Sequence, residues 1–546
     1  MNNWAGNILT FVSKHAYPIL LILFVLWTCI GVFPLQCYEE DGLEISLGAD
    51  IMYREGWNLP PIYSYEYRMQ PMVTIVLVCL KHLVPRFSCE QMYAAVTAIS
   101  SLLFLLGCVA FARHVTKESR TKILLAAMLL PEMYAIAMYS NTAIPAAACL
   151  IWALVLITRK RYWLSVVLIC LAPLIRLDIV IVYPLLLPLF YYEGMSLKKS
   201  IVVSASYGVA VVTVCLSLFW LMNADALSTF TNYERWNDKI NDMQRFLAIF
   251  GYYSLAYFLL LPIGLWFMGR KKLWKELFLV VFPIALSHYF YGQMGNASKH
   301  FLYNSPFVII AGVRAFQWIE STVWKKPLLK WATIVAVVVF TTCSVRKQHT
   351  FAWLLNNPMN SAGIAVPIAT VGVGDTNLEL AIGAGSQVLT GDEFMLGSGH
   401  LFYSWYIHSI KKVKENWRAQ QKAFLDGLPT SNIVTYEWAA SAPSSLEYMT
   451  EGYRFCRETD KTGKYAFTIY NPERKLRYYR VYWTVADHSN KRVIETIDSV
   501  AASFVEGEGY IISAPNHFGT TQYLDSIADM GRVEKKAGNL YKILKK

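Results

Sequence analysis

Four carboxylates stand within six positions of the segment QCYEEDGLEIS: Glu39, Glu40, Asp41 and Glu44. Neighbouring carboxylates raise one another's pKa, which suits a general base that takes a proton from an attacking hydroxyl. Carboxylate oxygens are also the ligands that hard divalent cations prefer. A plainer interpretation is a solvated acidic loop without chemistry. Both interpretations stay open on composition, although the cluster directly follows an apolar run over 17–35.

Further ionisable residues lie inside apolar sequence. Arg176 and Asp178 stand in the run PLIRLDIVIVYPLL. Lys299 and His300 stand at the start of SKHFLYNSPFVII. Ionisable residues at such positions are rare and usually face a cavity or one another. Their cations can stabilise a departing phosphate through charge-assisted hydrogen bonds. The alternatives are a structural Arg–Asp pair that closes a helix turn and an ordinary interfacial Lys–His anchor.

The chain lacks the motifs of common nucleotide-dependent and hydrolytic enzymes. It has no P-loop, no GxGxxG that opens a helix after a strand, no HExxH and no GxSxG. Its ten cysteines are scattered singly, without a CxxC pair or a zinc spacing. The sequence therefore assigns no metal ligands, and it leaves open whether a divalent ion takes part.

The elements that position these residues are predicted to be membrane spans. The chain is 55% hydrophobic and 16% charged, whereas soluble proteins carry roughly 25% charged residues. Long apolar runs, each able to cross a ~30 Å hydrocarbon core, recur through the first two thirds of the chain. We predict eleven spans, near 17–35, 91–112, 122–140, 142–158, 162–176, 177–193, 200–222, 246–268, 275–292, 301–318 and 328–344.

Charge in the connecting segments predicts the orientation of these spans. Basic residues gather at 113–122, 159–161, 198–199, 269–272 and 324–326, which the positive-inside rule places in the cytoplasm. The acidic stretch 36–70 and the loop 223–245 then lie outside. This alternation requires that 71–85 does not cross, so we interpret it as an interfacial or re-entrant helix. The net charge of +12 reports topology and does not indicate a nucleic-acid partner.

The tail has the composition of a separate domain. We predict a transmembrane domain over 1–344, with an acidic outer loop over 36–90, and a soluble extracytoplasmic α/β domain over 345–546. The tail pattern predicts a helix and several short strands: a helix over 402–425, strands at 388–391, 432–436 and 510–514, and a hairpin formed by 465–471 and 477–485.

The first two thirds of the chain resemble the GT-C glycosyltransferases, a family of polyprenyl-phosphate-sugar-dependent membrane enzymes that includes mannosyltransferases and lipid A aminoarabinose transferases. The resemblance covers roughly residues 10–345. Four segments carry it, and their arrangement counts for more than any single motif: YEEDGLEISLGADIMYREGWNLPPIYSYEYRMQP (38–71), YSNTAIP (139–145), PLIRLDIVIVYPLL (173–186) and SKHFLYNSPFVII (298–310).

The resemblance implies roles for the ionisable residues. One member of Glu39–Glu40–Asp41 becomes the catalytic base, with Asp41 and Glu40 the first choices. Arg68 stands where the aminoarabinose branch has a lysine that contacts the donor phosphate, and the resemblance implies that Arg68 takes this role although the lysine itself is absent. Phosphate or substrate binding extends to four more residues: Arg176, Asp178, Lys299 and His300. Some members have a second acid where this chain has Asn141, which argues against a metal shared by two carboxylates.

The predicted function is transfer of a hexosyl- or pentosyl-type sugar, with inversion, from a polyprenyl-phosphate donor to an extracytoplasmic lipid, glycan or protein. The lipid-linked sugar phosphate is a co-substrate, and membrane lipid surrounds the protein. A transporter or lipid-linked-glycan flippase is the alternative, and a non-catalytic envelope-assembly protein is a second. The bacterial inner membrane is preferred over the endoplasmic reticulum. The resemblance does not name the sugar, the acceptor or the linkage.

Overall fold

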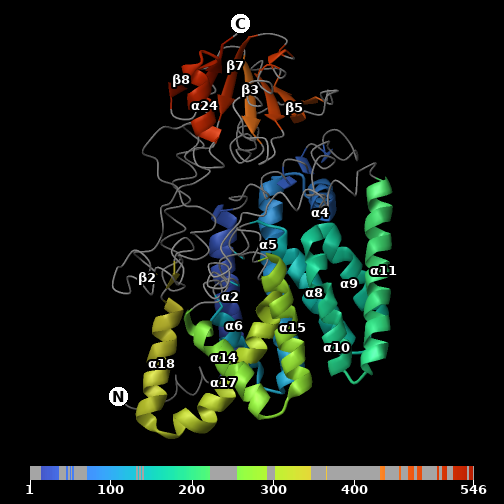
Figure 1. The fold of residues 1–546 in the computed structure, drawn as a ribbon, viewed down its shortest axis with the longest axis vertical. Helices are drawn as coiled ribbons and strands as arrows, with labels where there is room; N and C mark the ends of the chain where they lie inside the picture. The colour runs from blue at the N-terminus through green and yellow to red at the C-terminus, as the bar shows by residue number, and fades with distance from the viewer. Residues whose placement is uncertain are drawn as a thin grey trace.

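The structure is a computed structural model. It describes residues 14–35, 45–46, 49–50, 52–53, 71–130, 133, 137, 140–221, 255–291, 302–342, 344–345, 364–365, 431–436, 454–456, 465–471, 476–481, 498, 501–502, 504, 507–512, 520–537 and 540–544. Within this part of the chain, a bundle of helices carries the first two thirds of the sequence and a seven-stranded sheet lies beyond one end of the bundle (Figure 1).

Helices occupy the apolar runs, because a helix satisfies its own backbone hydrogen bonds where water is absent. Two of the described helices are long and apolar enough to cross a membrane, Cys89–Thr116 and the stretch Leu197–Leu218, and several shorter apolar helices accompany them. The bundle comprises α2 (Ala16–Leu35), α4 (Pro71–Leu83), α5 (Cys89–Thr116), α6 (Arg120–Met128), α8 (Ala143–Thr158), α9 (Tyr162–Ile175), η3 (Leu177–Leu185), α10 (Leu186–Tyr192), α11 (Leu197–Leu221), α14 (Leu255–Arg270), α15 (Trp274–Tyr291), η5 (Leu302–Asn304), α17 (Ser305–Thr322), η6 (Val323–Lys325) and α18 (Pro327–Thr342).

Most of the predicted spans coincide with a helix, but one differs in form and another is described only in part. Of the predicted span over 122–140, helix α6 covers the residues up to Met128, and most of those from 131 to 139 lie outside the described residues. The predicted span over 177–193 is a 3-10 helix followed by the short helix α10, and Pro184 interrupts the α-helical hydrogen bonding there. The total of eleven spans stays a prediction.

Helix α4 covers most of the segment that was predicted not to cross. Its 13 residues rise only about 20 Å at ~1.5 Å per residue, which is short of the hydrocarbon thickness. Residues such as Leu77 and Val78 are fully buried, and the helix packs against α5 and α9. Its length agrees with an interfacial or re-entrant helix.

Close backbone approach joins α14 to α17. A Cβ added at Gly264 would lie 2.0 Å from the carbonyl oxygen of Ala311, so only glycine fits there. A Cβ at Gly312 would meet the ring and hydroxyl of Tyr257. That hydroxyl donates to the carbonyl of Ala126 at 2.7 Å. These contacts tie α14, α17 and α6 into one packed unit.

A charged network holds four helices together at the end of the bundle away from the sheet. The Nε and Nη2 of Arg314 donate to the two carboxylate oxygens of Glu276 at 2.6 and 2.7 Å. Arg314 Nη1 also donates to Gln317, and Gln317 Nε2 donates to Glu118 at 2.5 Å. Lys122 lies 3.1 Å from the Glu118 carboxylate. Glu118 stands in the turn between α5 and α6, and Arg314 Nη1 also donates to the Thr116 carbonyl at the end of α5. The network therefore connects α5 and α6 with α15 and α17, which lie far from them in sequence.

The tail contributes a mixed sheet with the strand order β4-β5-β6-β3-β7-β9-β8. Its central strand β3 is parallel to both β6 and β7, and Ile433 pairs with Tyr478 on one side and with Tyr510 on the other. The strands are β3 (Ser431–Tyr436), β4 (Arg454–Cys456), β5 (Tyr465–Asn471), β6 (Leu476–Val481), β7 (Glu508–Ile512), β8 (Val533–Ala537) and β9 (Leu540–Ile543), with helix α24 (Thr520–Asp529) before β8.

These strands confirm several predicted elements of the tail. The strands predicted at 432–436 and 510–514 are β3 and β7, and the predicted hairpin is the antiparallel pair β5–β6. The strand predicted at 388–391 and the helix predicted over 402–425 lie outside the described residues. A separate two-residue pair, β1 (Ser344–Val345) with β2 (Ile364–Ala365), is antiparallel. The division of the chain into domains at 344/345 stays a prediction.

Candidate functional site

Two of the predicted site residues lie in the described part of the chain, and the structure brings them together. Arg176 follows the last residue of α9 in an extended conformation, and Asp178 stands in the first turn of η3. The other predicted residues lie outside the described residues: Glu39, Glu40, Asp41, Arg68, Lys299 and His300.

Arg176 and Asp178 form a buried ion pair. The Arg176 Nε lies 2.9 Å from Oδ1 of Asp178 and donates to Oδ2 at 3.1 Å. Only 6% of Arg176 and 3% of Asp178 is exposed. The extended backbone at Arg176 breaks the helix between α9 and η3, which lets side chains two positions apart face each other. An ion pair at this depth is held tightly, because Coulomb attraction strengthens where water is excluded.

A third residue fixes the guanidinium from another helix. Arg176 Nη1 donates to the hydroxyl Oγ1 of Thr142 at 3.0 Å. Thr142 directly precedes α8, and the side chain of Asn141 accepts a hydrogen bond from the backbone N–H of Ile144 at 3.1 Å. Asn141 therefore satisfies a free donor in the first turn of α8. Sequence reasoning singled out the YSNTAIP turn but missed Thr142.

Polar groups of α15 and η5 lie at the same end of the bundle as Arg176 and Asp178. Ser287 Oγ donates to Asn304 Oδ1 at 2.8 Å. The Nδ1 of His288 lies 2.6 Å from the carbonyl of Ile284. Because a carbonyl only accepts, Nδ1 carries the proton, which leaves Nε2 as an acceptor when the ring is neutral. Helix α15 packs against η3, and η5 packs against α8. These groups were not predicted, although Asn304 lies in the SKHFLYNSPFVII segment.

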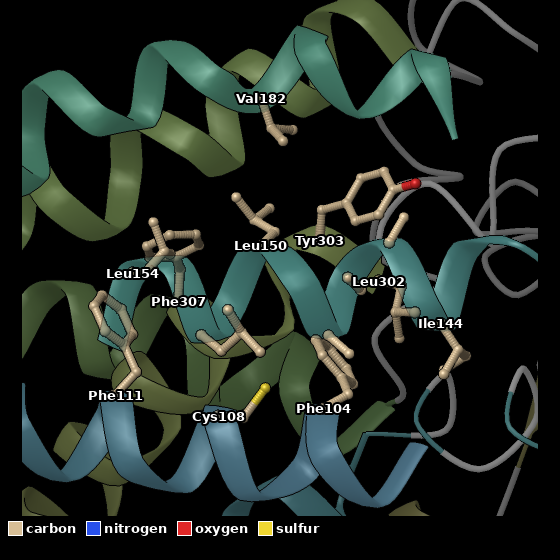
Figure 2. Close-up of a cluster of buried hydrophobic side chains, with 14 of the residues drawn as sticks. Phe104, Cys108, Phe111, Ile144, Leu150, Leu154, Val182, Leu302, Tyr303 and Phe307 are labelled. Atoms are coloured by element: carbon tan, nitrogen blue, oxygen red, sulfur yellow. The ribbon is translucent and has the colours of Figure 1, made fainter. Parts of the chain in front are cut away.

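An apolar cluster supports this end of the bundle. Figure 2 shows side chains of α5, α8, η3, η5 and α17 interdigitating, among them Phe104, Leu150, Val182 and Phe307. Tyr303 is 1% exposed, and its hydroxyl points away from the neighbouring Leu150 (Figure 2). Tight packing of this cluster fixes the positions of the residues next to it, and a binding site requires such fixed positions.

The arrangement presents a cation in a fixed orientation. A guanidinium that is oriented by a carboxylate and a hydroxyl has the geometry to bind phosphate oxygens. Within the described ranges, no three His, Cys, Asp or Glu side chains gather closely enough to hold a metal ion. The same Arg–Asp pair also fits a purely structural role, because each charge neutralises the other.

Comparisons with known proteins identify the architecture. No family model and no curated protein matches the sequence, but solved structures match the fold. ArnT from Cupriavidus metallidurans in the apo state superposes with a TM-score of 0.55 at 13% identity, over 97% of this chain and 98% of the other. The same protein bound to undecaprenyl phosphate gives 0.51 at 12% identity, over 98% of each chain.

The chain has the fold of ArnT. This confirms, at the level of architecture, the resemblance to GT-C transferases that the sequence indicated. The match extends over nearly all of both chains. At this low identity the likeness concerns the fold.

Proposed function

We propose that this protein is an integral-membrane glycosyltransferase that moves a sugar from a polyprenyl-phosphate donor to an extracytoplasmic acceptor. The observation that carries the proposal is the ArnT-like fold over nearly the whole chain, since one of the two ArnT structures holds undecaprenyl phosphate. The buried, oriented guanidinium of Arg176 supports it with a group that suits the donor phosphate.

In the proposed reaction, a carboxylate of Glu39–Glu40–Asp41 removes the proton from an acceptor hydroxyl. The oxygen attacks the anomeric carbon as the bond from that carbon to the phosphate oxygen breaks, so the configuration inverts. The polyprenyl phosphate leaves with the negative charge, which Arg176 stabilises. Lys299, His300 and Arg68 are further candidates for the phosphate contacts.

Transfer of radiolabelled sugar tests this proposal. Membranes that contain the protein receive polyprenyl-phosphate sugars one at a time, and labelled products are separated from labelled donor. We expect transfer from one donor by the wild type and loss of transfer in Asp41→Asn or Glu40→Gln. Arg159→Gln serves as a control, because Arg159 is exposed and lies at the end of α8 opposite Thr142, the hydrogen-bond partner of Arg176.

The outcomes separate the function classes. Near-normal transfer in both acidic variants would exclude the acidic cluster as the base while leaving the enzyme class intact. Absence of transfer from every donor, together with movement of labelled lipid across the membrane, would instead establish the flippase alternative. All variants should be expressed at the same level and elute at the same size after solubilisation in detergent. A loss of transfer then reflects the chemical step and not misfolding.

A further inference from the structure

Three lysines occupy left-handed backbone conformations at the end of the bundle away from the sheet. Lys117, Lys160 and Lys272 have φ angles of 61°, 59° and 58°. They are the only residues other than glycine with positive φ in the described part of the chain. Side chains other than glycine, asparagine and aspartate rarely adopt this conformation, because the Cβ crowds the backbone. We call the three helix-ending turns that contain Lys117, Lys160 and Lys272 the lysine turns.

The helix ends there do not need a lysine. At the end of α8, the N–H of Lys160 donates to Ile157 and the next N–H donates to Leu156, both at 2.9 Å. Lys272 and its successor make the same pair of bonds at the end of α14, at 3.0 Å. This is the helix-ending pattern in which glycine normally takes the left-handed position.

Glycine does take that position elsewhere in this chain. Gly194 after α10 and Gly531 after α24 have φ angles of 94° and 69°, and in each turn the glycine N–H and the next N–H donate the same two hydrogen bonds. Since the backbone motif forms with glycine, a lysine adds strain to it without adding a backbone bond. What the lysine contributes is its charge.

The charges of the lysine turns face outward. Lys117, Lys160 and Lys272 are all exposed, and within the described residues none of them forms an ion pair. The nearby acids Glu118 and Glu276 already pair with Lys122 and Arg314. Many other exposed basic residues lie at the same end: Arg113, Arg120, Arg159, Arg161, Lys198, Lys199, Arg270, Lys271, Lys275, Lys325 and Lys326.

Aromatic side chains place this basic surface at the depth of lipid headgroups. Trp163 and Trp274 are exposed next to the lysine turns, at 71% and 62%. The Arg270 guanidinium lies 5.4 Å from the ring centre of Trp266, and Lys275 Nζ lies 4.8 Å from that of Tyr191. Tryptophan and tyrosine prefer the membrane–water interface. The turns at this end of the bundle (Figure 1) thus present cations where phospholipid phosphates would lie.

We propose that the lysine turns bind the headgroups of anionic phospholipids. Multiple basic residues beside membrane helices attract such lipids, and the attraction falls within a Debye length. A basic surface that serves only to orient the chain during insertion needs positive charge somewhere in each loop, and unstrained neighbours such as Lys271 already supply it. A lysine in the one strained position of a turn indicates that its location matters.

Thermal unfolding of the purified full-length chain in detergent tests the proposal, since membrane topology no longer matters there. Phosphatidylglycerol is the anionic probe and phosphatidylcholine the zwitterionic one. We expect phosphatidylglycerol to raise Tm by several degrees more than phosphatidylcholine does, and high salt to remove the difference.

Three triple variants distinguish the effect of charge at the lysine turns from the effect of backbone strain and from the effect of basic charge elsewhere on this surface. K117N/K160N/K272N keeps a residue that tolerates the left-handed conformation but removes the charge, and we expect it to lose most of the Tm difference between the two lipids. K117R/K160R/K272R keeps the charge and should retain the difference. K198N/K199N/K271N removes the same charge from unstrained positions and should lose less than half of it.

Several results would overturn the proposal. Equal Tm shifts with the two lipids would show that this surface has no preference for anionic headgroups. A K117N/K160N/K272N variant that keeps the full difference, or a K198N/K199N/K271N variant that loses as much, would exclude a special role of the lysine turns. K117G/K160G/K272G gives a second charge-free variant if the asparagine variant fails to fold.

Discussion

The guanidinium of Arg176 donates a hydrogen bond to the hydroxyl of Thr142 at 3.0 Å, although 34 positions separate the two residues in sequence. Thr142 precedes α8 and Arg176 follows α9, so this bond closes the far end of a helical hairpin. Asp178 holds the same guanidinium through Nε. Contacts from two separate elements therefore hold the Arg176 guanidinium in one orientation.

A double-mutant cycle distinguishes a phosphate-binding Arg176 from a structural one. Arg176→Met alone leaves the buried Asp178 carboxylate without its ion-pair partner, which should cost roughly 3–5 kcal/mol of stability. The double variant R176M/D178L removes both charges and should recover most of that loss. If Arg176 binds the donor phosphate, sugar transfer stays lost in the double variant. Thermal unfolding and transfer assays measure the two effects.

The control for this cycle is Asp178→Asn, which keeps the shape of the side chain while removing its charge. We expect it to weaken donor binding more than turnover, because it loosens the guanidinium without removing it. Full transfer activity in R176M/D178L would show that the pair only closes the helix turn.

Thr142→Val should destabilise the protein by roughly 1.5–3 kcal/mol, because a buried hydrogen bond to a charged group is lost. Thr142→Ser keeps the hydroxyl and should stay close to the wild type. Unfolding midpoints in denaturant at neutral pH measure both variants. Equal midpoints for Thr142→Val and Thr142→Ser would mean that the hydroxyl does not contribute to holding Arg176.

Gly264→Ala should destabilise the bundle by at least the ~1–3 kcal/mol typical of overpacking. The added Cβ would lie 2.0 Å from the Ala311 carbonyl oxygen, and the backbone there cannot rotate away as a side chain would. Gly208→Ala on α11 is the matched control, because its Cβ meets nothing within 4 Å. That change should stabilise the helix by roughly 0.5–1 kcal/mol. The Tm of each variant is compared with that of the wild type. An unchanged Tm for Gly264→Ala would contradict the close approach of α14 and α17.

Acid should weaken the charged network through Glu118. Burial raises the pKa of this carboxyl, but hydrogen bonds from Gln317 and Lys122 and the charge of Lys122 outweigh it, so the pKa lies below its ordinary value of 4.5. A group with a depressed pKa stabilises the folded state above its unfolded pKa, and this contribution is lost as the pH falls through the folded value. The Tm advantage of wild type over Glu118→Gln should therefore be present at neutral pH and shrink below 4.5.

The measurement is a series of thermal unfolding curves from neutral to acidic pH for both proteins. Lys122→Gln provides a second comparison, because it removes the cation that pairs with Glu118 and should reduce the pH dependence. A Tm difference between wild type and Glu118→Gln that grows in acid would have the opposite sign and would rule out this assignment.

Local pattern accounts for much of the helical bundle. The apolar run over 17–35 became α2 (Ala16–Leu35), and 162–176 became α9 (Tyr162–Ile175). Hydrophobic length and turn chemistry act over a few residues, so they can be read directly along the chain. The same holds for the β5–β6 hairpin, in which a short NPERK connection joins two alternating strands. The sequence also marked Arg176 and Asp178, because charges in apolar runs are rare.

Tertiary packing decided which of these elements meet. The sequence placed Arg176 where the predicted spans 162–176 and 177–193 meet, but it did not indicate that its partner is Thr142 at the start of α8. It indicated strands β3, β6 and β7, but not that β3 lies between the other two as a parallel strand. It predicted a continuous span over 177–193, where η3 and α10 follow one another. Helix and strand formation depend on near neighbours, whereas the choice of a distant partner depends on the shape and burial of the whole assembly, and no local pattern contains that information.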